Sequence, residues 1–166
     1  PAEDTIEYAA CLARAGALEE ADNLLKKPLL LKNPHAIFNR AVIKFRKWEY
    51  AEGAVLLTQY LSTHGLSKYE IMTAKLNLAF AYGYIYQVKK AKPFVMEVLA
   101  EISPENDRLL YSNALRLLGC LDILREEFTT ALAYFEKAAQ SLQASSSLDL
   151  FLCKKWVAIT HFMRSP

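Results

Sequence analysis

The residue types that most often catalyse reactions or bind metal ions are scattered along this sequence of 166 residues. The histidines, His35, His64 and His161, are far from one another, and the sequence has no HExxH motif, nucleophile elbow, GxGxxG or P-loop. Each histidine is interpreted as a surface or cap residue, because zinc sites bring several ligands together at characteristic spacings. The sequence therefore predicts no catalytic residue, no metal site and no cofactor, and it favours a protein that is not an enzyme.

The three cysteines, Cys11, Cys120 and Cys153, lie far apart and form no CxxC pair. Each has apolar neighbours of helical character, where a free buried thiol is ordinary. A reducing compartment, the cytoplasm, is therefore expected. No stretch reaches the roughly 18 apolar residues of a membrane span, and no signal peptide precedes the first expected helix. Pro1 in place of an initiator methionine is interpreted as the start of a processed or excised chain.

Charges are segregated in the first 48 residues. Residues 1–25 hold six acids and one base, whereas residues 26–48 hold seven bases and no acid. The favoured interpretation is two solvated faces that attract each other within the fold. The other is a basic surface for a partner, because Arg40, Lys44 and Lys47 recur at i, i+4 and i+7 and share one helical face. The net charge of +2 is too small to indicate nucleic-acid binding by itself.

Helices are expected to position these side chains. The sequence has only five glycines and six prolines, it lacks alternating strand patterns, and its long stretches are rich in Ala, Leu, Glu and Lys. We predict an all-α fold of about nine helices. The expected helices pair into hairpins at about 4–27, 34–63, 67–102 and 107–143, and a Ser-rich turn at 144–147 leads to a last helix at about 148–163.

The hairpin pattern is clearest between Leu115 and Leu142. There Leu118 precedes Gly119, and an expected second helix repeats Phe128, Ala131, Phe135 and Ala138 at the spacing of one helical face. Small residues such as Gly119 and Ala131 let two antiparallel helices approach closely. The corresponding small residues of the four hairpins lie 32, 38 and 40 residues apart: Ala21, Gly53, Ala91 and Ala131.

This pattern resembles the tetratricopeptide repeat (TPR), a helical hairpin that recurs about every 34 residues. The resemblance covers almost the whole chain. It implies a single domain, residues 1–166, in which hairpins stack into a right-handed superhelix and the last helix covers the open face of its neighbour. In the second hairpin we prefer the register that buries Phe38, Ala41, Val42 and Phe45, because the alternative buries two unpaired cations.

The resemblance also implies a concave groove, lined by the first helices, that accepts an extended peptide or a helix. The residues carried over to this groove are Asn39, Arg40, Ile43 and Lys47 of the second hairpin, Asn77, Phe80 and Tyr84 of the third, and Asn113, Arg116 and Cys120 of the fourth. An asparagine amide both donates and accepts, so it can hold a peptide backbone. The leading hypothesis is an adaptor or chaperone-like scaffold for a protein or peptide, with an acidic segment favoured by the nearby bases.

Two other hypotheses stay open. One, suggested by Pro1, is a sensory or oligomerising region of a larger signalling protein. On this hypothesis the chain could associate with itself. The weaker one is a nucleic-acid-binding helical repeat, suggested by the bases of residues 26–48. An affinity for nucleic acid that falls steeply with salt would identify the latter. No membrane partner is expected.

Overall fold

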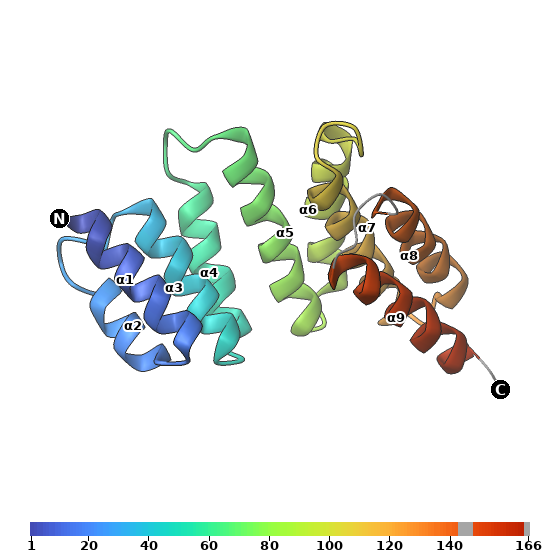
Figure 1. Cartoon of the computed structure of the whole chain (residues 1–166), viewed down its shortest axis with the longest axis horizontal. Helices are drawn as coiled ribbons and strands as arrows, with labels where there is room; N and C mark the ends of the chain where they lie inside the picture. Colours follow the sequence, from blue (N-terminus) through green and yellow to red (C-terminus); the bar gives the residue numbers. More distant parts are fainter. Residues whose placement is uncertain (143–147, 165–166) are drawn as a thin grey trace. The chain divides into compact units, whose positions relative to one another are not determined.

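The chain folds into helices joined by short turns. A computed structural model describes residues 1–142 and 148–164, and these residues form nine α-helices and no strand (Figure 1). The helices are α1 (Ala2–Ala15), α2 (Leu18–Leu25), α3 (Pro34–Arg46), α4 (Tyr50–Leu61), α5 (Lys68–Tyr84), α6 (Val88–Glu101), α7 (Arg108–Ile123), α8 (Phe128–Leu142) and α9 (Leu148–Arg164). The all-α prediction is confirmed. The turn predicted at 144–147 lies outside the described residues.

Several helix ends follow directly from the sequence. Asn33 caps α3 by accepting a hydrogen bond from the backbone N–H of Ala36 at 3.2 Å. Ser67 and Glu70 form a reciprocal capping box at the start of α5. Gly16 ends α1 in the left-handed conformation, with φ of 94°.

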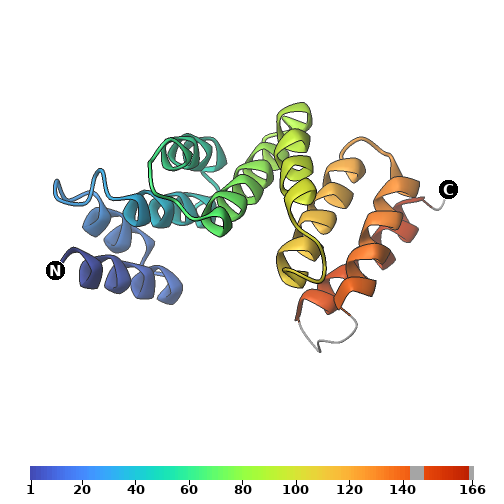
Figure 2. The ribbon, with the colours of Figure 1, turned by 90° about the horizontal axis from the view of Figure 1, so that it is seen from above.

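The contacts of the chain group it into two compact units, an N-terminal unit of residues 1–85 and a C-terminal unit of residues 86–166. In the N-terminal unit α1 packs on α2, α3 on α4, and α4 on α5, while α3 also contacts α1 and α2 (Figures 1 and 2). In the C-terminal unit α7 packs on α6 and α8, and α9 packs on α8. The third predicted hairpin is thus divided at its turn. The prediction of one domain stays a prediction.

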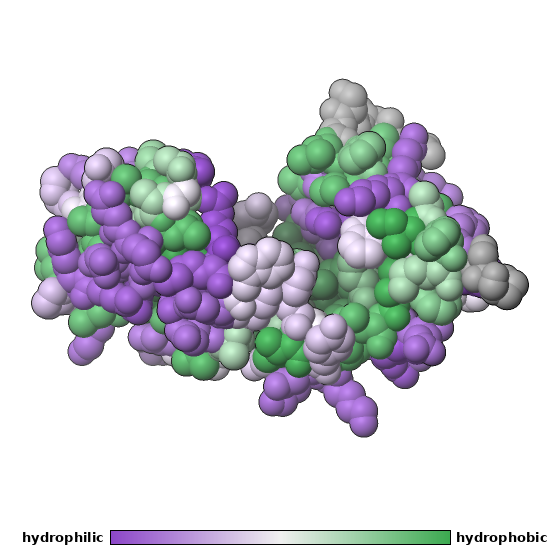
Figure 3. All heavy atoms as spheres, turned by 90° about the horizontal axis from the view of Figure 1, so that it is seen from below, coloured by the Kyte–Doolittle hydropathy of each residue, from purple (hydrophilic) through white to green (hydrophobic). Residues whose placement is uncertain are grey.

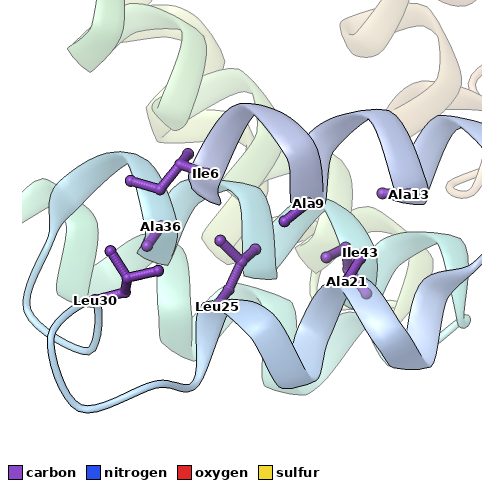
Figure 4. Close-up of a cluster of buried hydrophobic side chains, with 8 residues drawn as sticks. All are labelled: Ile6, Ala9, Ala13, Ala21, Leu25, Leu30, Ala36 and Ile43. Carbon is purple, nitrogen blue, oxygen red and sulfur yellow. The ribbon is translucent and has the colours of Figure 1, made fainter. Parts of the chain in front are cut away.

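The core of the N-terminal unit depends on small side chains. Figure 4 shows the cluster that joins α1, α2 and α3: Ile6, Ala9, Ala13, Ala21, Leu25, Leu30, Ala36 and Ile43. Four of these eight residues are alanines, so the helix backbones can approach closely while the larger aliphatic side chains fill the remaining volume. Leu30 is the buried residue of the apolar connector between the first two hairpins.

The turn inside each hairpin repeats one backbone conformation. Gly16, Trp48, Tyr86 and Glu126 all have positive φ, and they lie 32, 38 and 40 residues apart. A buried small residue follows each of them five positions later: Ala21, Gly53, Ala91 and Ala131. The two sets therefore have the same spacings. Backbone and burial therefore mark the same four repeats that the small residues indicate in the sequence.

Glycines mark the closest helix approaches in two hairpins. A Cβ on Gly53 would collide with the ring of Phe45, and a Cβ on Gly119 would lie 2.6 Å from Cε1 of Phe135. In the C-terminal unit, Trp156 of α9 stacks on Phe135 at 5.7 Å between ring centroids, so the last helix covers the last hairpin as predicted.

The register preferred for the second hairpin is wrong: Ala41 is fully buried seven residues before Trp48, as Ala9 is before Gly16, so the turn has the same length as in the first hairpin. Arg40 and Lys44, the cations that this observed register covers, are paired with Asp22, Glu49 and Glu52.

Candidate functional site

The N-terminal unit carries a cluster of partly exposed aromatic side chains, which we call the aromatic patch. It consists of Phe45 at the end of α3, Trp48 in the following turn, Tyr50 at the start of α4, and Phe80 and Tyr84 on α5. Tyr50 and Tyr84 stack at 4.3 Å between centroids, and Phe80 lies 4.6 Å from Tyr84. Phe45 and Tyr50 each lie about 6 Å from Phe80. The rings therefore form one continuous surface from three segments of the chain.

This surface is unusually accessible for its apolar content. Trp48 is 75% exposed, Tyr84 50% and Phe80 37%, while Phe45 and Tyr50 are half-buried beneath them. Contiguous exposed apolar patches are uncommon on proteins that bind nothing, and aromatic residues are enriched in protein interfaces. The packed rings below hold the exposed ones in place, so a partner would meet a largely formed surface.

Trp48 stands in the patch with an uncommon backbone conformation. Its φ is 64°, in the left-handed region that glycine adopts at the equivalent position of the first hairpin. A bulky residue there costs about 1–2 kcal/mol relative to a relaxed backbone. The same left-handed turn recurs in the other hairpins, so the backbone belongs to the repeat, whereas the exposed indole is particular to this position. The core does not explain this residue.

The basic side chains predicted for the groove are engaged within the chain. Arg40 Nε lies 3.3 Å from Oδ1 of the buried Asp22, and Lys47 Nζ lies 2.7 Å from Glu19 and 3.3 Å from Glu49. A hydrogen bond from Lys44 to Glu49, and a second pair with Glu52 at 2.6 Å, raise the pKa of the Lys44 ammonium above its usual range. Acidic residues before and after the basic stretch thus pair with it. This matches the favoured interpretation of the charge segregation, since Arg40, Lys44 and Lys47 each have an acidic partner within the chain.

The other predicted groove residues of the N-terminal unit have different surroundings. Ile43 is 1% exposed and lies beside Ala21 in the core (Figure 4), so its place in the predicted groove is corrected. The reason is that α3 packs against α1, α2 and α4, which leaves it a narrower free face than helical spacing alone suggests. Asn77 donates a hydrogen bond to the carbonyl of Thr73 at 2.9 Å. Asn39 lines a pocket at the N-terminal ends of α3 and α5.

Asn113, Arg116 and Cys120 lie on α7 in the C-terminal unit. Arg116 donates a hydrogen bond to Oδ1 of Asn113 at 2.8 Å, so each is the partner of the other. Burial raises the pKa of the Cys120 thiol to about 11, against the opposing charge of Arg116, and burial likewise raises the pKa of Cys153. Both thiols are therefore protonated and poorly nucleophilic near neutral pH.

The sequence singled out two of the five patch residues, Phe80 and Tyr84. Phe45 was assigned to the hairpin interior, where one side of its ring does lie over Gly53. Tyr50 was expected to repeat the large and small spacing of the second hairpin together with Gly53, Leu57 and Tyr60. Trp48 received no assignment, although a tryptophan at the turn position held by Gly16 in the first hairpin is a signal in the sequence. This signal can be recognised only after the hairpins have been aligned with one another, because the alignment shows that Trp48 and Gly16 hold the same turn position.

A second exposed apolar surface lies on α9, where Leu148, Phe151 and Phe162 are accessible. On the face shown in Figure 3, hydrophilic residues cover most of the N-terminal unit, and hydrophobic residues take up more of the C-terminal unit. Across residues 1–142 and 148–164, no three His, Cys, Asp or Glu side chains gather closely enough to hold a metal ion. Within the same residues, no helix has the length and apolar character that crossing a membrane requires.

Comparison with known proteins identifies the fold. No protein-family model matches the sequence, and no curated protein matches it significantly. Among solved structures, the nearly identical TPR-like repeats of a Podosopora anserina protein assigned as a kinesin light chain match with a TM-score of 0.72 and 16% identity, covering 96% of this chain and 84% of that one. MamA residues 41 to the end from Desulfovibrio magneticus RS-1 match with a TM-score of 0.66 and 16% identity, covering 99% and 97%.

A double mutant of MamA from RS-1 matches with a TM-score of 0.68 and 15% identity, over 99% of this chain and 96% of that chain. Likeness at this level of identity concerns the fold alone. The chain has a TPR-like helical-repeat fold, as the resemblance in its sequence predicts.

Proposed function

We propose that this TPR-like chain is a protein-interaction scaffold that binds a peptide or helical segment of a partner protein on its aromatic patch. The observation that carries the proposal is the cluster of exposed rings formed by Trp48, Tyr84 and Phe80, which Tyr50 joins by an edge contact to Trp48 and a stacked contact to Tyr84. Tryptophan and tyrosine dominate the energetically important positions of protein interfaces, because they bury a large area at a small cost in conformational entropy.

The charges around the patch support a partner that is bound mainly through apolar contacts. Lys44 and Lys47 are both paired with Glu49, so little unpaired charge surrounds the rings. Association through them would therefore depend only weakly on salt, in contrast to nucleic-acid binding, which weakens steeply as salt rises. The adaptor or chaperone-like role predicted from the sequence is the form of this function that we favour.

The test is a selection of binders from a display library of random peptides against the immobilised full chain. Selected peptides are then synthesised, and their affinities are measured by fluorescence anisotropy. We expect Trp48→Gly to weaken binding by tenfold or more, since hot-spot residues contribute about 2 kcal/mol or more. The substitution suits the turn, because glycine adopts positive φ readily.

Tyr86→Gly is the matched control. Tyr86 is an exposed aromatic residue with φ of 58° at the equivalent turn position, and it lies in the other unit. Binding should survive this change. The proposal fails if no peptide is selected, or if the Trp48 and Tyr86 variants bind the selected peptides as tightly as the original chain does.

A further inference from the structure

A pocket with a volume of about 210 Å³ opens where the N-terminal ends of α3 and α5 meet the C-terminal part of α4. Its lining residues are His35, Phe38, Asn39, Tyr60, Tyr69, Glu70 and Thr73. We propose that this pocket holds a basic side chain, lysine or arginine, of the same partner segment that covers the aromatic patch. The inference rests on the proposed function and specifies the chemistry of the partner.

Glu70 supplies a fixed negative charge to the pocket. Hydrogen bonds from the Ser67 hydroxyl and backbone N–H hold the pKa of the Glu70 carboxyl below its usual range, and the nearby His35 lowers it further. One oxygen, Oε2, accepts both Ser67 bonds, at 2.6 and 2.8 Å. The other, Oε1, meets the Tyr60 hydroxyl at the long distance of 3.4 Å. A carboxylate has about four acceptor positions, so Oε1 can still accept from an ammonium or guanidinium group.

Aromatic rings form the walls beside this carboxylate. Phe38 and Tyr60 lie 5.2 Å apart between centroids, and Tyr69 also lines the pocket. Burial and the adjacent Glu70 raise the pKa of Tyr60 to about 12, so its hydroxyl stays neutral and donates. Ring faces attract a cation, and the aliphatic stem of lysine or arginine packs well on them. An acidic side chain would instead be repelled by the negative charge of the Glu70 carboxylate.

Thr73 adds a polar atom that has no partner of its own. Its Oγ1 is buried, and no described residue within hydrogen-bonding distance pairs with it. Because this oxygen is covered in the free chain, it can accept a hydrogen bond from an entering basic group only once the Thr73 side chain turns toward the pocket. The acceptor Glu70 Oε1 thus sits among aromatic walls, with the unpaired Thr73 hydroxyl beside it in the lining. This arrangement suits a donor-rich side chain with an apolar stem.

The size of the pocket favours a side chain over a separate small molecule. Sites for drug-sized ligands usually occupy about 300–1,000 Å³, which is larger than the volume found here. A basic side chain that belongs to a bound segment also gains from being tethered, because its contacts add to those made at the patch.

One face of α5 connects the pocket with the aromatic patch. Thr73, Asn77, Phe80 and Tyr84 follow one another at four, three and four residues, so they lie along a single stripe. The stripe from Thr73 to Tyr84 spans about 16 Å at 1.5 Å per residue, which an extended peptide covers in about five residues. Asn77 lies midway along this stripe, and its bond to the Thr73 carbonyl uses the amide nitrogen and not the amide oxygen.

The experiment compares the sequences of the peptides that were selected for binding to the full chain. We expect them to share a lysine or arginine with an aromatic or large aliphatic residue about three to five positions away. In a synthetic peptide, replacing that lysine by the neutral norleucine, or that arginine by citrulline, should weaken binding to the original chain by about tenfold, the usual effect of losing one charged hydrogen bond in a partly buried site.

The Glu70→Gln variant completes a double-mutant cycle with these peptides. Glutamine keeps a capping side chain for Ser67 but removes the charge, so basic and neutral peptides should bind this variant equally. Glu136→Gln, at an exposed position of α8, is the matched control and should keep the full preference. Thr73→Val is a second test that does not depend on Glu70, and it should reduce the preference several-fold without lowering the free energy of unfolding.

The outcomes separate the two proposals. The pocket inference would be overturned if the selected peptides carry an aromatic anchor but show no basic preference, or show an acidic one. It would also be overturned if a basic preference survives both Glu70→Gln and Thr73→Val. In each of these cases the scaffold function would still stand. A failure to select any peptide, or binding that is indifferent to Trp48→Gly, would remove the proposed function and this inference with it.

Discussion

The ring of Phe135 in α8 packs directly on the backbone of Gly119 in α7. A Cβ on Gly119 would lie 2.6 Å from Cε1 and 2.7 Å from Cζ of that ring. The ring has little room to retreat, because Phe135 is fully buried and stacks on Trp156. We expect Gly119→Ala to overpack this hairpin at a cost of about 1–3 kcal/mol, offset by about 1 kcal/mol from better helix propensity. Urea unfolding should show a net loss of up to about 2 kcal/mol.

The same substitution in a Phe135→Leu background provides the control. A leucine side chain leaves space for the new methyl group, so Gly119→Ala should there raise the free energy of unfolding by about 1 kcal/mol through helix propensity alone. An identical loss in both backgrounds would show that the ring is not the cause.

Local sequence signals were sufficient to predict the hairpins, since the features that define them are local. Gly119, Gly53 and their alanine counterparts recur at the register of the repeat, and Gly16, Asn33 and Ser67 end or begin helices through contacts within four residues. Helical spacing and capping chemistry depend on near neighbours along the chain, so one sequence reveals them.

The candidate site was harder to predict because it depends on contacts between segments. Ile43 shares a helical stripe with Asn39 and Lys47, yet it is buried because α1 and α2 cover that part of α3. Trp48 joins the patch only because its turn brings it to Tyr50, and Tyr50 in turn stacks on Tyr84 from a different helix. Spacing within one helix gives neither the width of its covered face nor the identity of its neighbours.

Asp22 should make the N-terminal unit sensitive to acid. Burial acts to raise the pKa of its carboxyl, but Lys26 at 2.5 Å and Arg40 at 3.3 Å outweigh burial and hold this pKa below the ordinary value of 3.8. A carboxyl with a lowered folded-state pKa stabilises the fold above its unfolded-state pKa, and this stabilisation disappears as the pH falls through the folded-state value. The contribution of Asp22 should therefore be constant from neutral pH to about pH 5 and shrink below about pH 4.

Asp22→Asn isolates this contribution from those of other acids. At neutral pH the variant should lose about 1–3 kcal/mol of unfolding free energy, because Arg40 is left half-buried without its charged partner. Urea unfolding followed by circular dichroism at several pH values gives the difference between the two proteins. A difference that stays the same down to pH 3 would contradict the assignment.

Ala131 tests the packing of the last hairpin from its other helix. It is fully buried at the position where α8 approaches α7, so Ala131→Leu should force side chains out of their preferred rotamers and destabilise by about 1–3 kcal/mol. Glu136→Gln, on the exposed face of the same helix, should change stability by less than about 0.5 kcal/mol. The fluorescence of Trp156, which stacks on Phe135, reports this unfolding. Equal effects of the two changes would place Ala131 outside the helix interface.

Trp48 allows stability and binding to be separated. With φ of 64°, its backbone would be relieved by glycine, which should contribute about 1 kcal/mol. Removing the indole loses its edge contact with Tyr50, at 6.1 Å between centroids, which is worth about 0.5–1 kcal/mol. The free energy of unfolding of Trp48→Gly should thus be unchanged or raised slightly. Trp48→Ala removes the same contact but keeps the strain, so it should be about 1 kcal/mol less stable than the glycine variant.

Both Trp48 variants lack the exposed ring, so both should lose peptide binding to the same extent despite their different stabilities. Denaturant titration and fluorescence anisotropy on the same preparations measure the two quantities. If alanine and glycine gave equal stability, the turn would not hold a left-handed conformation in solution. If binding followed stability instead of the presence of the ring, Trp48 would act through the fold and not through contact with a partner.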